Sequence, residues 1–226
     1  MKDVGYLISL AVILQSIETF WIRPWSWKHL AIEFPPFIRP LLSRPVWLLT
    51  VRLLAAVGAL FWPDPALIAL MLVGTWLVAW RWRGTLNGGS DVMTFHILAA
   101  WLVATIWPEL QHGCVFYIAV QMALSYVVAG LVKIRNPDWR SGRALAVFLQ
   151  RVGRTVSPPV CLILSWSLIA FELLFPLSVI APVPVVALAI AFHLANTYIL
   201  NLNRFFFVWL AGYPSVFLVS QQILRS

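Results

Sequence analysis

Residues 114–132 read CVFYIAVQMALSYVVAGLV, a run of nineteen residues without a charged side chain. A helix needs about 20 predominantly apolar residues to cross the hydrocarbon core of a bilayer, so this run predicts a transmembrane helix. The rest of the chain has the same character, because 62% of its 226 residues are hydrophobic and only 11% are charged. Soluble domains carry about 25% charged residues. The composition therefore excludes a water-soluble globule and predicts a polytopic membrane protein.

Similar apolar runs, separated by prolines, follow one another along the chain. The expected spans cover residues 4–20, 46–62, 65–80, 91–107, 114–132, 159–180, 183–200 and 205–219. We therefore expect an all-α fold, a membrane helical bundle of about eight transmembrane helices. The last run contains Gly212 and Pro214. Because proline breaks or bends a helix, seven helices plus a partial, bent or re-entrant one is the alternative.

The basic residues alternate between the two ends of these spans. Of the 16 Lys and Arg residues, 13 lie in four segments, at 21–45, 81–90, 133–158 and 201–204. The connections between them, at 63–64, 108–113 and 181–184, contain none. The positive-inside rule then predicts that the basic loops face the cytoplasm and that both termini face outward. Topology and contact with anionic membrane lipids explain the net charge of +8, so we expect no nucleic-acid partner.

The longest basic loop predicts a helix that lies along the membrane surface. On a helical wheel over residues 138–154, one face collects Leu145, Phe148, Leu149 and Val152, and the other collects Arg140, Arg143, Arg151 and Arg154. Such a helix lies in the headgroup layer with its apolar face toward the hydrocarbon. We therefore expect these four arginines to contact lipid. Residues 21–45, which combine Trp21, Trp25, Trp27 and Phe34 with Pro and Arg, predict a second interfacial segment.

The cysteines and histidines form no recognisable metal or redox motif. Cys114 and Cys161 fall at opposite ends of neighbouring expected spans, about 30 Å apart. A disulfide needs Cα atoms within about 7 Å, so we expect free thiols. The four histidines are too scattered along the sequence to predict a metal site.

Several polar residues fall inside the expected spans, where ionisable groups are costly and typical of functional sites. We expect Glu18, Arg52, His96 and Lys133 in the cytoplasmic half and Glu172 in the outer half. The seventh span adds residues that share one arc of a helical wheel, namely His193, Asn196, Thr197, Asn201 and Arg204. Together these residues predict a polar intramembrane pocket. The alternative is hydrogen bonding between helices, worth about 0.6 kcal/mol per contact.

A short motif starts at Ala129-Gly130, continues through Lys133, and ends at Trp139 and Gly142. This AG-x-x-K…W-x-x-G element resembles that of the HTTM superfamily, which includes vitamin K-dependent γ-glutamyl carboxylase. Further matches are Leu86-Asn87-Gly88-Gly89, Phe171-Glu172 with Pro176, and Phe192-His193. The resemblance extends from about Arg44 onward and implies one HTTM-like transmembrane domain over residues 1–226.

The resemblance implies that Lys133 is the base that deprotonates a quinol, with a quinone, lipid-like or peptide substrate. The alternative is a lysine that ends a helix and extends to the inner headgroups. Two departures matter. The carboxylase has a histidine where this chain has Gly88-Gly89-Ser90-Asp91, and the large domain that binds the peptide is absent. We therefore do not expect γ-carboxylation of glutamate. The resemblance is to compact bacterial members, which implies the bacterial inner membrane.

Two classes of function remain open. In the first, the protein is a membrane enzyme with Lys133 as base and with Arg52, His96 and His193 shaping the pocket. In the second, it is a small non-catalytic subunit that supplies helices, lipid contacts or cofactor packing to a larger complex of membrane protein subunits. A transporter is less favoured, because we find no internal repeat of the kind that builds secondary carriers.

Overall fold

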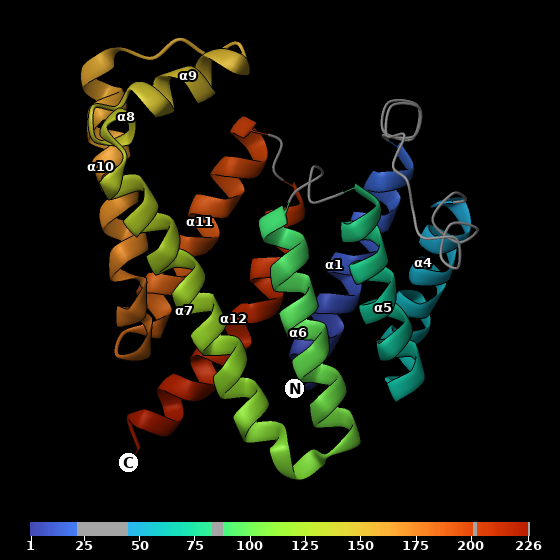
Figure 1. Cartoon of the computed structure of the whole chain (residues 1–226). Helices are drawn as coiled ribbons and strands as arrows, with labels where there is room; N and C mark the ends of the chain where they lie inside the picture. The colour runs from blue at the N-terminus through green and yellow to red at the C-terminus, as the bar shows by residue number, and fades with distance from the viewer. Residues whose placement is uncertain (22–44, 83–87, 201–202, 226) are drawn as a thin grey trace. The chain divides into compact units, whose positions relative to one another are not determined.

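The computed structural model describes residues 1–21, 45–82, 88–200 and 203–225 (Figure 1). Within these ranges every regular element is a helix, which confirms the expected all-α fold. The second predicted interfacial segment, residues 21–45, lies outside the described residues except at its two ends, and Asn201 also lies outside them.

Ten α-helices and two short 3-10 helices occupy the described ranges. The α-helices are α1 (Lys2–Trp21), α4 (Pro45–Phe61), α5 (Pro65–Trp82), α6 (Gly88–Ile106), α7 (Gln111–Arg135), α8 (Pro137–Arg140), α9 (Arg143–Arg151), α10 (Pro158–Leu174), α11 (Pro182–Leu200) and α12 (Asn203–Ile223). The 3-10 helices are η1 (Pro108–Leu110) and η2 (Phe175–Val179). Many of these helices begin at a proline, because its fixed φ suits the first helical position and its missing N–H has no partner there anyway.

Six segments in the described ranges are helical, long and apolar enough to cross a membrane. They are Lys2–Trp21, Gly89–Ile106, Pro108–Arg135, Pro158–Val179, Pro182–Ile199 and Asn203–Ile223. Helices α4 and α5 are also apolar but shorter. The chain is thus a helical integral membrane protein, and the number of eight crossings stays a prediction. The last helix, α12, runs without interruption through Pro214.

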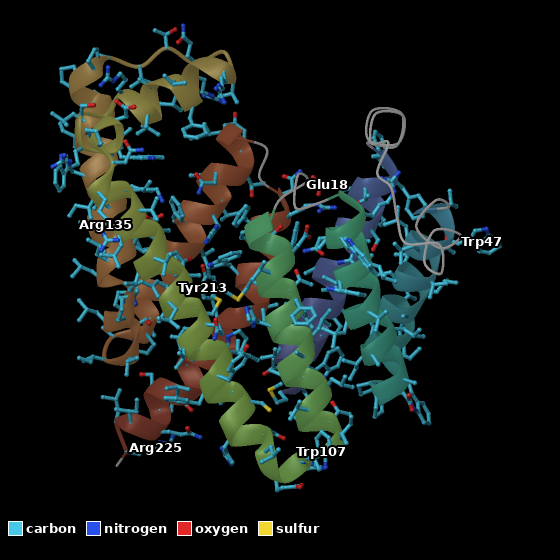
Figure 2. All side chains as sticks on the ribbon, in the orientation of Figure 1. Glu18, Trp47, Trp107, Arg135, Tyr213 and Arg225 are labelled. Atoms are coloured by element: carbon cyan, nitrogen blue, oxygen red, sulfur yellow. The ribbon has the colours of Figure 1, made fainter. Side chains whose placement is uncertain are left out.

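The outer surfaces of the helices carry large apolar side chains. Trp47 is 64% exposed and projects away from the neighbouring helices (Figure 2). Phe61 and Trp62 are more exposed still. Soluble monomers rarely expose contiguous apolar surface of this kind, whereas lipid solvates it readily.

Residues Met1–Ile118 and Phe207–Ser215 form one compact unit. In it α1 packs against α4, α4 against α5, α5 against α6, and α6 back against α1, so the four helices close a ring. The interior of this ring contains fully buried apolar residues, among them Ile8, Leu49, Ile68, Met71 and Ile97.

Residues Ala119–Phe206 and Val216–Ser226 form the second compact unit. Helix α9 lies across the long axes of α7 and α10 (Figure 1) and contacts α10 and α11. The amphipathic helix predicted over 138–154 is present as α9, but it is shorter than predicted and the stretch is divided into two helices. Gly142, with φ 77°, separates α8 from α9, since a left-handed residue cannot continue a right-handed helix.

Candidate functional site

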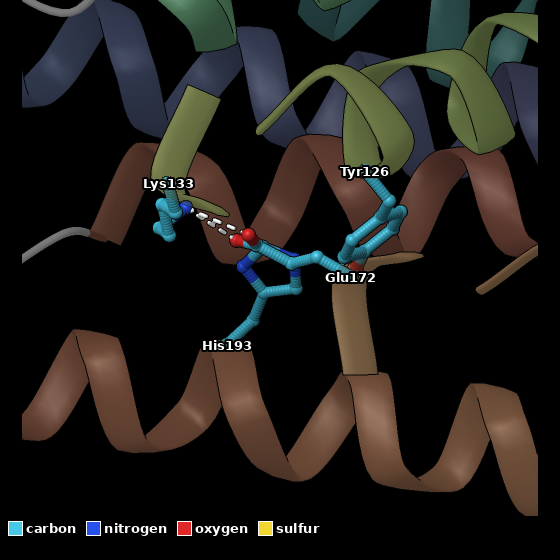
Figure 3. A network of polar contacts seen from close by, with 4 residues as sticks. All are labelled: Tyr126, Lys133, Glu172 and His193. Carbon is cyan, nitrogen blue, oxygen red and sulfur yellow. Dashed lines mark hydrogen bonds and ion pairs between the residues drawn. The ribbon is translucent and has the colours of Figure 1, made fainter. Parts of the chain in front are cut away.

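An ion pair joins α7 to α10 in the second unit. The Lys133 Nζ donates to both carboxylate oxygens of Glu172, at 2.6 Å and 2.8 Å. The Lys133 side chain is 16% exposed and that of Glu172 is 5% exposed. Figure 3 shows the two side chains meeting between their helices. A charged pair shielded to this degree is costly unless its hydrogen bonds are well made, as they are here.

Gly130, one helical turn before Lys133, explains why the two helices come close enough for this pair. A Cβ added at Gly130 would lie 2.9 Å from the side chain of Leu173 and 3.2 Å from the Cβ of Glu172. Small residues let helix backbones approach one another in membranes. The glycine of the AG-x-x-K motif thus lets α7 approach α10, so that the lysine of the same motif can reach Glu172.

The second half of the motif packs against the first turns of α10. The Ser165 hydroxyl donates to the backbone carbonyl of Trp139, and the Trp166 Nε1 donates to the carbonyl of Arg140 at 3.1 Å. A Cβ at Gly142 would lie 2.6 Å from the backbone nitrogen of Leu162. Only glycine fits this close approach, so the W-x-x-G element fixes α8 and the following turn onto α10.

Trp139 also contacts the lysine of the pair. The Lys133 Nζ lies 5.2 Å from the centroid of a Trp139 ring, within the range of a cation–π interaction. The ammonium group therefore has a carboxylate and an aromatic ring as neighbours. The motif residues Gly130, Lys133, Trp139 and Gly142 together form one structural unit around the ion pair.

A second polar contact lies close by, between α7 and α11. The Tyr126 hydroxyl and the Nε2 of buried His193 are 2.7 Å apart, and Figure 3 shows both side chains beside the Lys133–Glu172 pair. The Tyr126 ring stacks on Phe175, with centroids 3.9 Å apart. Phe171 meets Tyr126 edge-on, with centroids 5.6 Å apart. Aromatic rings therefore surround the polar atoms of this contact.

The expectation that Lys133 extends to the lipid headgroups is wrong, because its amine binds Glu172. The charged groups of the two residues meet, and their expected placement in opposite halves of the membrane stays a prediction. Helix α7 ends two residues after Lys133, at Arg135. Lys133 therefore lies in the last turn of its helix, as expected from the sequence.

The first unit contains a separate polar network around Arg52, which is 1% exposed. Its guanidinium donates to the Gln15 Oε1 at 2.6 Å, to the Ser16 hydroxyl at 3.2 Å and to the Thr75 hydroxyl at 3.1 Å. Gln15 in turn donates to the hydroxyl of Thr94 at 2.9 Å. The planar guanidinium fork suits such multiple contacts, and the network links α1, α4, α5 and α6.

The other predicted site residues are dispersed. In the first unit, the His96 Nδ1 lies 2.6 Å from the Tyr117 hydroxyl, and Glu18 is half-buried on α1. In the second unit, Asn196 is half-buried on α11 and Arg204 is buried on α12. A single pocket that includes Arg52, His96, Lys133 and His193 stays a prediction, because these residues belong to two separately described units.

The remaining candidate residues are the four arginines, the two cysteines and the possible metal ligands. The four arginines predicted to contact lipid are all exposed, namely Arg140, Arg143, Arg151 and Arg154. Cys114 and Cys161 are free and buried. Among the residues that the structure describes, no group of three or more His, Cys, Asp or Glu residues could hold a metal ion.

Sequence reasoning missed Tyr126, Gln15 and Thr75 as site residues. The sequence does carry a signal for Gln15, because Gln15, Ser16 and Thr19 place three polar residues on one side of a mostly apolar helix. Tyr126 gave no such signal, because a tyrosine within an apolar run is equally typical of ordinary core packing.

Comparison with protein-family models, with curated proteins and with solved structures gives no match for this chain.

Proposed function

We propose that this protein is an HTTM-like membrane enzyme whose Lys133–Glu172 pair moves a proton on a quinol or similar lipid-like substrate. The observation that carries the proposal is the ion pair itself, held by two hydrogen bonds between helices of a membrane protein. Ionisable residues within membrane helices are expensive and are by default associated with function. The resemblance of the surrounding motif to HTTM proteins supports the same conclusion and the assignment of Lys133 as base.

The pair offers a balanced route for one proton. An ammonium group is not a base, so Lys133 first transfers a proton to the Glu172 carboxylate, to which it is already hydrogen-bonded. The neutral amine then takes the proton of a quinol hydroxyl. The products are a quinolate, a protonated Glu172 and a Lys133 ammonium whose positive charge stabilises the new anion. No oxidant is needed for this step.

The aromatic side chains near the pair support a ring-shaped substrate. Trp139 lies against the Lys133 amine, and Tyr126, Phe171 and Phe175 form a connected group of rings. Rings of this kind favour offset-stacked or edge-on contacts with another planar ring. A quinol combines such a ring with the acidic hydroxyl that the proposed proton transfer requires.

The test uses the purified protein in lipid nanodiscs and a reduced short-chain naphthoquinone under anaerobic conditions. An ionised quinol absorbs at longer wavelength than the neutral form. The wild-type protein should bind the quinol and produce the ionised spectrum. Lys133→Arg keeps the positive charge but cannot accept a proton at neutral pH, since the pKa of arginine exceeds about 12. This variant should bind the quinol and leave it neutral.

The matched control is Arg135→Lys, the opposite exchange two residues further along the same helix. It should behave as the wild-type protein does. Ionisation that persists in Lys133→Arg, or a wild-type protein that does not bind the quinol, would contradict the proposal.

The second candidate is a non-catalytic subunit of a membrane complex. It is favoured by the engagement of both Glu172 oxygens with Lys133, because such a pair can serve simply to join α7 to α10. In that case the double variant Lys133→Leu/Glu172→Leu should recover the stability lost in either single variant, as is common when a buried ion pair is replaced as a whole. It should also keep the protein in its complex.

The proposed setting follows from the sequence. The alternation of basic loops supports an orientation with both termini outside, and the resemblance to compact bacterial proteins supports the bacterial inner membrane.

A further inference from the structure

Helix α9 presents an apolar face that its neighbours cover only in part. Leu149 is buried where α9 lies on α10 and α11. Phe148 and Val152 share this side of the helical wheel but are 43% and 37% exposed. Because α9 crosses the direction of α7 and α10 (Figure 1), this open half of its apolar face lies at one end of the bundle of helices in its unit.

The same region is strongly basic. Residues 137–157 contain four arginines and one acidic residue, Asp138, which gives a net charge of +3. All four arginines are exposed. Arg143 lies on the side of α9 away from Phe148 and Val152, whereas Arg151 follows Phe148 by three residues and neighbours it on the helix surface. The Arg143 pair with Asp138, at 2.7 Å, is exposed as well. Exposed pairs contribute little, so this pair leaves Arg143 available to another anion.

Two aromatic contacts lie beside the arginines. The guanidinium of Arg154 lies 5.5 Å from the Tyr198 ring centroid on α11. Phe148 lies against Trp139, with ring centroids 5.9 Å apart. Tyr and Trp side chains collect at the boundary between hydrocarbon and water. Their position beside the arginines therefore indicates that α9 lies at this boundary.

We propose that the α8–α9 surface, formed by Arg140, Arg143, Phe148, Arg151, Val152 and Arg154, is a binding site for anionic phospholipid. The arginines bind the phosphate and other anionic headgroup oxygens, in the forked geometry that guanidinium favours. Phe148 and Val152 insert between acyl chains. A soluble anion would match the charges but leave the open apolar face in water. A phospholipid binds both the arginines and the apolar residues of this surface. The proposal does not depend on the chemistry of Lys133.

The test measures lipid retained on the full-length protein by native mass spectrometry after extraction from membranes with equal amounts of phosphatidylglycerol and phosphatidylcholine. The wild-type protein should retain phosphatidylglycerol preferentially. Arg143→Gln/Arg151→Gln should lower this preference by about fivefold for each arginine removed, the effect of one basic residue near an anionic surface. The control Lys2→Gln/Arg225→Gln removes two charges from exposed residues elsewhere and should leave the preference unchanged.

Two further measurements separate binding from misfolding. Arg143→Lys/Arg151→Lys keeps both charges and should keep the preference for phosphatidylglycerol. With the wild-type protein alone, an increase from low to high salt should reduce the preference, because exposed charges are screened. Equal preference in the wild-type and Gln variants, or an equal loss in the Lys2/Arg225 control, would overturn the proposal.

Discussion

Gly130 of α7 lies against Leu173 of α10 with no room for a side chain between them. An added Cβ would come within 2.9 Å of both the Cγ and the Cδ2 of Leu173. This contact sets the separation of the two helices one turn before Lys133. The ion pair with Glu172 therefore depends on the small size of residue 130 as much as on the two charged side chains.

Gly130→Ala should destabilise the protein. The extra methyl group forces Leu173 to move, and overpacking of this kind costs about 1–3 kcal/mol. The control is Gly113→Ala in the same helix, where an added Cβ meets nothing within 4 Å. There alanine should be neutral or stabilising by up to about 1 kcal/mol, its advantage in helix propensity. Thermal unfolding in detergent measures both variants, and equal unfolding temperatures would contradict the packing argument.

Gly142 and Gly153 allow backbone strain to be separated from steric contact. Both have positive φ, at 77° and 74°, so alanine at either position should cost about 1–2 kcal/mol. Only at Gly142 would the new Cβ also meet backbone atoms, those of Cys161 and Leu162. Gly142→Ala should therefore lower the unfolding temperature clearly more than Gly153→Ala. A similar decrease in both would show that the turn does not depend on its contact with α10.

Tyr126→Phe removes the hydroxyl that meets His193 and leaves the stack on Phe175 in place. Hydrogen bonds between membrane helices average about 0.6 kcal/mol and reach about 1.7 kcal/mol, so we expect a loss in this range. Tyr6→Phe is the control, because Tyr6 is 56% exposed and should tolerate the change. Chemical denaturation in mixed micelles can resolve the difference.

The topology can be tested with single cysteines introduced into a variant that lacks Cys114 and Cys161. If both termini face outward, a membrane-impermeant thiol reagent added from outside should label Asp64→Cys and Glu109→Cys and miss Arg143→Cys. The expectation rests on the segregation of 13 of 16 basic residues into alternate loops. The opposite labelling pattern would show that the chain is inserted the other way round.

The helices could be predicted because the length of an apolar run can be read directly from neighbouring residues in the sequence. For example, the expected span 114–132 lies within α7, which extends from Gln111 to Arg135. The ion pair could not be predicted in this way. Lys133 and Glu172 are 39 positions apart, and their meeting depends on how α7 and α10 are aligned, which contacts at Gly130, Trp139 and Ser165 determine.

The break at Gly142 was missed for a different reason. A helical wheel over 138–154 records only where polar and apolar residues fall and contains no information on φ. The left-handed residue was visible in the sequence as the glycine of W-x-x-G. Its consequence for the helix appears only when Gly142 is seen against the backbone of Leu162.

The central claim is that Glu172 receives the proton that Lys133 releases when a quinol is ionised. Infrared difference spectroscopy of the wild-type protein in nanodiscs, recorded as the reduced naphthoquinone is added, tests it most directly. We predict the appearance of the carbonyl band of a protonated carboxyl group, and its loss in Glu172→Gln. Bound quinol without this band, or the same band in Glu172→Gln, would contradict the assignment of the pair as the proton-transfer site.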